Sequence, residues 1–186
     1  EVEGNRRQLH LRSAELRMAQ MLRVRASGHA YDDAARFDAK LTANVAGGLL
    51  AAQVDADIAQ QAYSLRATAS ALPLARFVPS LPVGPLSGSL NVSGRGFDFE
   101  SPRTALQANV DLKPVKVSGY SLDHLQLTAG LLQGEAQALM DVAGELGHLR
   151  AEVKAAMNGG YDVTAMLTGD EIDLQRLTGS ASTLKL

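Results

Sequence analysis

Residues 37–45 read FDAKLTANV, and in this stretch every apolar side chain is followed by a polar one. In an extended chain successive side chains point to opposite sides, so Phe37, Leu41 and Val45 fall on one side and Asp38 and Lys40 on the other. Alternation with a period of two is typical of a strand that has one buried and one solvated face. The stretch therefore predicts a half-buried β-strand.

The same alternation recurs through the rest of the chain, in residues 50–58, 63–69, 106–112, 125–129, 136–142, 149–155 and 161–167. Glycines fall between the runs, among them Gly28, Gly47-Gly48 and Gly130, and Asn158-Gly159 is a typical hairpin pair. Breaks spaced by ~10 to 15 residues favour antiparallel strands, because parallel strands need longer crossover connections. We expect an all-β fold, an elongated curved antiparallel sheet with one or two short helical turns.

Two alanine-rich stretches, residues 49–62 and 134–157, also allow a helical interpretation, because alanine is the best helix former. In both stretches the charged and amide side chains occupy alternate positions and follow no helical face. We therefore predict strands in both.

All six prolines lie between positions 73 and 114, and four of them fall within residues 73–85. A proline has no N–H to donate to a neighbouring strand, so a central strand is not expected there. Residues 73–78 could form one helical turn at an edge or end. The chain is thereby divided into an N-terminal β segment (1–72), a Pro-rich junction (73–85) and a C-terminal β segment (86–186), which could still form one continuous sheet.

The composition and the isolated polar residues indicate a protein without catalysis. The net charge of −2 argues against nucleic acid as a partner, the absence of cysteine excludes thiolate metal sites, and no apolar run is long enough to span a membrane. The four histidines are far apart, have no metal-ligand spacing and are expected on the surface: His10, His29, His124 and His148. We predict no catalytic residue, metal or cofactor.

Three further features have a structural and a functional interpretation. Gly94-Arg95-Gly96 is part of a phosphate-loop pattern but lacks the third glycine, so a turn or bulge is favoured. The acidic residues 169–173 lack the spacing of a calcium loop and suit the start of a helical turn at 174–177. The N-terminal arginines suit a solvated strand face, with anionic lipid headgroups as the functional alternative: Arg6, Arg7, Arg12, Arg17, Arg23 and Arg25.

The apolar side of such a sheet must be covered, because exposed apolar surface is unfavourable in water. The sheet could close into a barrel, pack on a second sheet with a dry core, or curl into an open groove that holds an apolar ligand. Many of the inward positions are alanine, which leaves room for a ligand. The candidate groove-lining residues are Phe37, Leu41, Val45, Val54, Leu65, Leu106, Val110, Leu127, Met140, Val153 and Val163.

Two segments resemble a known family. Arg76-Phe77, Pro82 and residues 86–96 (LSGSLNVSGRG) are similar to a linking segment of the AsmA and TamB-like proteins of double-membrane bacteria. Residues 117–125 (VSGYSLDHL) are similar to a hairpin of the same family. The chain resembles a middle or C-proximal segment of such a protein.

The resemblance implies a β-taco, a long curved sheet in the periplasm whose apolar groove carries phospholipid between the inner and outer membranes without catalysis. It also implies an inner-membrane anchor outside this segment. Two alternatives remain at this point. One is a module that assists assembly of outer-membrane β-barrel proteins by strand pairing. The other is a structural β-sandwich or adhesin stalk with a dry core.

Overall fold

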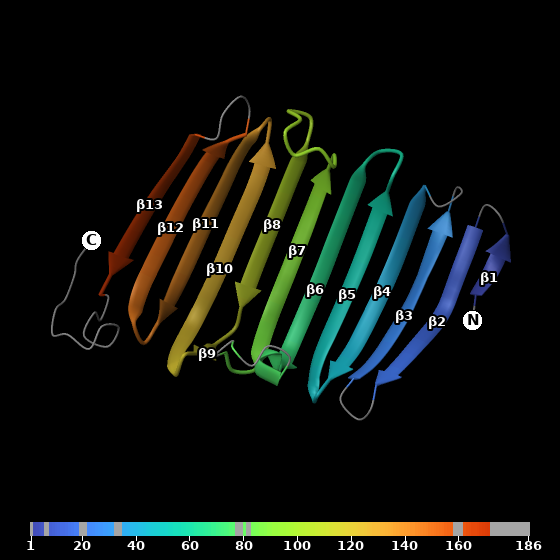
Figure 1. The fold of residues 1–186 in the computed structure, drawn as a ribbon, viewed down its shortest axis with the longest axis horizontal. Helices are drawn as coiled ribbons and strands as arrows, with labels where there is room; N and C mark the ends of the chain where they lie inside the picture. The colour runs from blue at the N-terminus through green and yellow to red at the C-terminus, as the bar shows by residue number, and fades with distance from the viewer. Residues whose placement is uncertain are drawn as a thin grey trace.

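The computed structural model describes residues 2–5, 8–18, 22–31, 35–76, 80, 83–157 and 162–171, which form one open antiparallel sheet (Figure 1). Within these residues the sheet has 13 strands and is accompanied by one 3-10 turn, η1 (Leu74–Arg76). The strands are β1 (Val2–Asn5), β2 (Gln8–Met18), β3 (Leu22–Tyr31), β4 (Arg36–Val45), β5 (Gly48–Asp57), β6 (Ala62–Leu72), β7 (Leu86–Arg95), β8 (Ala105–Leu112), β9 (Val115–Val117), β10 (Tyr120–Leu132), β11 (Glu135–Gly144), β12 (Gly147–Ala156) and β13 (Asp162–Asp170).

The strands follow one another across the sheet in chain order, and only the short β9 lies off this path, paired with the start of β10. Every pairing is antiparallel, as the spacing of the breaks predicts. The all-β fold and the antiparallel sheet are therefore confirmed. Both alanine-rich stretches are strands, β5 in the first and β11 and β12 in the second.

Tight turns connect the long strands. Ala46-Gly47 and Gln133-Gly134 each have positive φ at both residues (49° and 94°, 55° and 79°), the pattern of two-residue type I′ hairpin turns. The prediction that Gly47-Gly48 forms the break is therefore wrong by one residue, because Gly48 begins β5 opposite Val45.

Two other glycines predicted as breaks lie inside strands. Gly28 is in the middle of β3 and Gly130 is near the end of β10. A Cβ at Gly28 would lie 2.6 Å from the backbone oxygen of Asp38, so this glycine permits close contact with the neighbouring strand β4. A glycine in a strand pattern thus marks a close approach here and not a turn.

The strand register divides the side chains into two faces, because residues directly opposite one another in antiparallel strands project from the same face. Leu41, for example, opposes Ala26 of β3 and Ala52 of β5. Followed from strand to strand, the register places all the candidate groove-lining residues on one face, which we call the apolar face. The other face, which carries Asp38, Lys40 and their neighbours, is the polar face.

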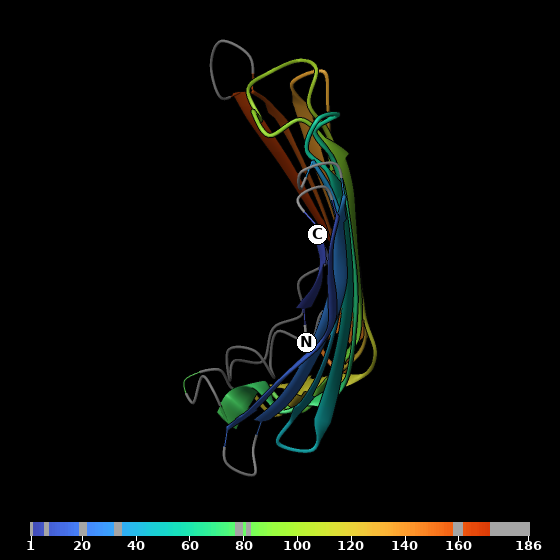
Figure 2. The same ribbon diagram turned by 90° about the vertical axis from the view of Figure 1, so that its right-hand side faces the viewer.

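Seen from its β1 edge, the sheet bends toward one side at both strand ends (Figure 2). Residues 96–104, the yellow-green loop at the top of that view, lean to the concave side, as does η1 at the bottom. Phe97 of the loop stacks on Tyr63, which belongs to the apolar face because it opposes Ala56 and Gly94. The apolar face is therefore the concave one.

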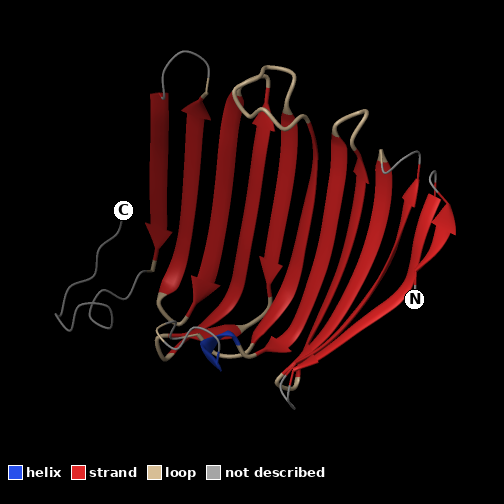
Figure 3. Cartoon of the chain, turned by 45° about the vertical axis from the view of Figure 1, so that its right-hand side comes forward, coloured by secondary structure: helices blue, strands red, loops and turns tan. Residues whose placement is uncertain are grey.

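The Pro-rich segment leaves the sheet after β6 and returns at β7. The helical turn predicted for residues 73–78 is present as η1, at the lower strand ends (Figure 3). Residues 77–79, 81 and 82 lie outside the described residues. Strands β6 and β7 pair with one another, so the segments on both sides of the prolines contribute to the same sheet.

The core is thin. Among the described residues, the buried apolar side chains are Ala43, Val45, Val115 and Leu131, all of which project from the apolar face. Thr104, which is 2% exposed, is the buried polar residue. Pairing between strands therefore contributes much of the order in this sheet, and a packed interior contributes little.

Candidate functional site

The apolar face is continuous across the sheet. One of its rows takes a single residue from each strand along the path from β2 to β13, and no member of this row is polar. The row is Ala14, Ala26, Leu41, Ala52, Ala67, Leu90, Val110, Leu127, Met140, Ala151 and Leu167.

The neighbouring rows have the same character. In the three rows nearest to the row through Leu41, the register places no charged side chain on the apolar face between β2 and β13. Tyr63 is the residue of these rows whose side chain has a polar atom. Eleven strands at about 4.8 Å give the face a length of about 50 Å.

This face lies largely open. The described residues contain no second sheet and no long helix that could cover it. Central members such as Leu65 and Val110 are half-buried by their neighbours, whereas Phe37 (36%), Val153 (37%) and Val163 (61%) are exposed. An uncovered apolar surface of this extent in a chain marks an interaction surface.

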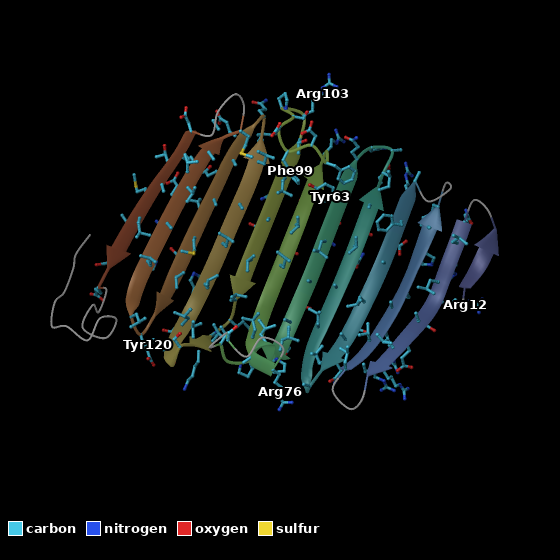
Figure 4. The ribbon with its side chains drawn as sticks, viewed as in Figure 1. Arg12, Tyr63, Arg76, Phe99, Arg103 and Tyr120 are labelled. Atoms are coloured by element: carbon cyan, nitrogen blue, oxygen red, sulfur yellow. The ribbon has the colours of Figure 1, made fainter. Side chains whose placement is uncertain are left out.

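The upper end of the apolar face is partly closed by an aromatic pair. Tyr63 and Phe97 stack with ring centroids 5.6 Å apart and an interplanar angle of 15°. The Tyr63 ring lies over Gly94 on the next strand, because a Cβ at Gly94 would be 2.5 Å from the ring carbon Cζ. Phe99 of the same loop lies at this end too, as the side chains show (Figure 4).

The short strand β9 lies at the lower end of the apolar face, paired with the start of β10. Val117 forms an isolated bridge with Val83 at the end of the Pro-rich segment, and Val115, 7% exposed, opposes Leu122 of β10. Tyr120 and Arg76 lie at this end of the sheet (Figure 4).

The polar face, in contrast, is occupied by ion pairs between strands. Glu15 Oε1 lies 3.0 Å from Arg17 Nε and 2.6 Å from Arg23 Nε, with Arg25 at 3.8 Å. The hydrogen bonds from Arg17 and Arg23 lower the pKa of the Glu15 carboxyl from 4.5 to about 2. Arg36 pairs with Asp57 at 2.8 Å. Of the N-terminal arginines, Arg17 and Arg23 therefore pair with Glu15 on the polar face.

The histidines are surface strand residues, but the fold brings them into contacts that their sequence separation did not indicate. His10 and His29 stack with centroids 4.1 Å apart, and His29 Nδ1 lies 3.1 Å from Asp38 Oδ2. On the other half of the polar face, His124 and His148 lie 3.2 Å and 3.0 Å from the two oxygens of Asp141.

Asp141 has a lowered pKa, caused first by the hydrogen bond with His148 and then by Arg150. Within the described part of the chain, no group of three or more histidine and carboxylate side chains is arranged to hold a metal ion. The histidine contacts could have been found from the sequence only once the hairpin register was known.

Two hollows formed by described residues lie on the polar face. One of ≈ 710 Å³ extends over β3 to β8 and is lined by Arg23, Thr42, Thr68 and Asp111 among others. A second, of ≈ 670 Å³, is lined by Tyr31, Arg36, Asp57 and their neighbours. Both are open depressions, and apolar side chains such as Leu49 line the first of them beside the polar ones.

The remaining sequence motifs have ordinary structural positions. Gly94 and Arg95 end β7 and Gly96 begins the following loop, with no helix in described residues 97–104. Gly169 and Asp170 end β13, whereas the helical turn predicted at 174–177 and the hairpin pair Asn158-Gly159 lie outside the described residues.

In comparisons with protein-family models, curated proteins and solved structures, none matches this chain. Among the described residues no helix is long and apolar enough to cross a membrane.

Proposed function

We propose that this chain is a non-enzymatic periplasmic segment of a longer envelope-spanning protein, and that its concave apolar face is a groove that carries phospholipid acyl chains between the inner and outer membranes. The observation that carries the proposal is the apolar face itself: it is continuous from β2 to β13 and uncovered within the described residues. The resemblance of residues 86–96 and 117–125 to AsmA and TamB-like proteins supports the same function.

The energetics of such a face favour lipid over a small specific ligand. Burial of one methylene group contributes about 0.8 kcal/mol, so an acyl chain laid on the face would be held by many small contributions. The side chains in the row through Leu41 are alanine, leucine, valine and methionine, which distinguish little between one position of the chain and the next. A tail would be held firmly and would still slide, whereas oriented binding requires fixed polar groups.

Native mass spectrometry of the detergent-free protein, with lipid extraction of the same sample, tests the proposal. We expect copurifying phospholipid and uptake of an added fluorescent fatty acid. A lipid-free monomer that also excludes the fatty acid would contradict the proposal and favour a dry structural role.

A second function has one observation in its favour. Strand β13 pairs with β12 alone among the described strands, contains neither proline nor lysine, and exposes Val163 (61%) and Met166 (62%). Edge strands without such protection accept a further strand. The second proposal is therefore strand pairing with an outer-membrane β-barrel client. It predicts peptide binding that Ala165→Pro abolishes and that charges on the apolar face leave unchanged.

A further inference from the structure

Residues 96–104 form a loop of fixed shape at the upper rim of the apolar face. Gly96, whose φ is +83°, donates its N–H to the Gln61 carbonyl at 2.8 Å. Within the loop, the N–H of Ser101 bonds to the carbonyl of Asp98 at 3.1 Å and that of Thr104 to the carbonyl of Ser101 at 3.0 Å. The Thr104 hydroxyl, almost completely buried, donates to the carbonyl of Asp98. These hydrogen bonds hold the backbone of the loop in one arrangement.

The loop lies at the boundary between the apolar face and the solvent. Phe97 stacks on Tyr63, the polar-tipped residue of the apolar face, and remains 52% exposed, while Phe99 is 48% exposed. Leu131, on the same row of the face as Tyr63, is only 6% exposed. Tyrosine side chains occupy the depth of lipid headgroups in membranes, and Tyr63 has such a polar tip, whereas Phe97 and Phe99 add exposed apolar area beside it.

The loop also carries two charged side chains of opposite sign, Glu100 and Arg103, that are not paired with other groups of the described residues. Glu100 and Arg103 are exposed, and among the described residues neither side chain takes part in an ion pair or a side-chain hydrogen bond. Asp98, by comparison, accepts the N–H of Glu100 at 3.1 Å. Arg103 extends beyond the upper ends of the strands (Figure 4). The rim therefore offers an anion-binding guanidinium and a cation-binding carboxylate beside an aromatic boundary.

We propose that residues 96–104 are a headgroup site for zwitterionic aminophospholipid: Arg103 binds the phosphate, Glu100 binds the amine, and Phe97 and Phe99 contact the glycerol region. The acyl chains then enter the apolar face beside Tyr63. A guanidinium suits the phosphate because it donates paired hydrogen bonds to its oxygens. The Glu100 carboxylate repels a phospholipid headgroup that carries a negative charge and no amine. This inference rests on the proposed lipid-carrying function and specifies the lipid class.

The test offers the protein vesicles of phosphatidylethanolamine and phosphatidylglycerol in equal amounts with identical acyl chains, after which the bound lipid is extracted and quantified. We expect wild type to enrich phosphatidylethanolamine about threefold or more, a size set by exposed charge-assisted hydrogen bonds. Glu100→Gln should return the bound ratio to that of the vesicles. Arg103→Glu should lower total bound lipid about threefold to tenfold.

Arg66→Gln is the matched control, because Arg66 is an exposed arginine on the polar face and should change neither the ratio nor the total. Bound lipid without enrichment in wild type, or enrichment that persists in Glu100→Gln, would overturn the headgroup site and leave the apolar groove intact. Absence of both lipids from wild type would overturn the groove itself.

Discussion

The two faces of this sheet share one backbone and differ in the partners that their side chains find. On the polar face, charged groups find partners across the strands, as Arg36 does with Asp57 and as Glu15 does with Arg17 and Arg23. On the apolar face, Phe37 and Val163 remain exposed, and the residues directly opposite them on the neighbouring strands are alanines. The polar face pairs many of its charges internally, although it also exposes Leu49, Leu132 and Met166, whereas the central rows of the apolar face carry no charged side chain. That difference is the reason why the proposed function is assigned to the concave side.

Reversing the character of the apolar face should have the largest effect. The triple variant Val54→Asp, Val110→Asp and Met140→Asp places three carboxylates in the proposed groove. We expect lipid occupancy to fall more than about tenfold, because an ionised group among acyl chains lacks hydration and partners. Extracted lipid per protein is the measurement.

The neighbouring residues of the same strands provide the control. Gln53→Asp, Asn109→Asp and Leu139→Asp put the same charges on the polar face and should leave occupancy unchanged. Circular dichroism would verify the strand content of both triple variants. Equal lipid loss in both would mean that added charge itself, and not the identity of the face, controls binding.

A smaller effect is expected from removing one aromatic ring from each face. Tyr63→Ala uncovers Gly94 and removes the stack on Phe97, so the free energy of unfolding should fall by about 1–2 kcal/mol. Tyr31→Ala removes a ring that is 38% exposed and stacked on His29 at 5.8 Å, so the loss should be below about 1 kcal/mol.

Urea unfolding followed by circular dichroism measures both, since the chain has no tryptophan. Tyr63→Phe keeps the ring and should behave as wild type. A larger loss in Tyr31→Ala than in Tyr63→Ala would show that the aromatic pair does not anchor the upper end of the apolar face.

The smallest effect should come from titration of the polar face. The folded-state pKa of Glu15 lies at about 2, below its ordinary 4.5, so the unfolded chain takes up a proton first as the pH falls. The contribution of this group to stability is complete above pH 4.5 and is lost as the pH falls toward 2. Because the ion pairs are exposed, the change should be slight.

Urea midpoints between pH 5 and pH 2 test this, with Glu15→Gln as the comparison. The variant should show a shallower decline with acid than wild type and the same lipid occupancy at neutral pH. Identical pH profiles of the two proteins would mean that the arginine contacts of Glu15 do not stabilise the fold.

Much of the fold could be predicted from local patterns, and the errors have physical causes. The alternation in residues 37–45 predicts β4 and its faces correctly, because side-chain direction in a strand depends only on position parity. The prediction of a break at Gly28 is wrong, because a glycine that permits close approach of strands has the same sequence signal as one in a turn. The turn at Ala46-Gly47 required a positive φ at alanine, which propensity disfavours.

The candidate site could be predicted only in part. The face shared by Phe37, Val110 and Met140 follows from parity and pairing, whereas the loop at Phe97 gave no sequence signal beyond a glycine pattern. The His29–Asp38 contact depends on the register of one hairpin, and the His124–Asp141–His148 contacts depend on two. A single residue of slip would reverse every such pairing.

The sequence by itself determined that the chain forms strands with one apolar and one polar side, because a period of two is a property of the extended backbone. Only the tertiary structure decided that the strands stay in one open sheet, that the apolar side is concave, and that residues 96–104 fold over its upper end. These features depend on strand twist accumulated over many pairings and on contacts such as Tyr63 with Phe97, which join residues distant in the chain.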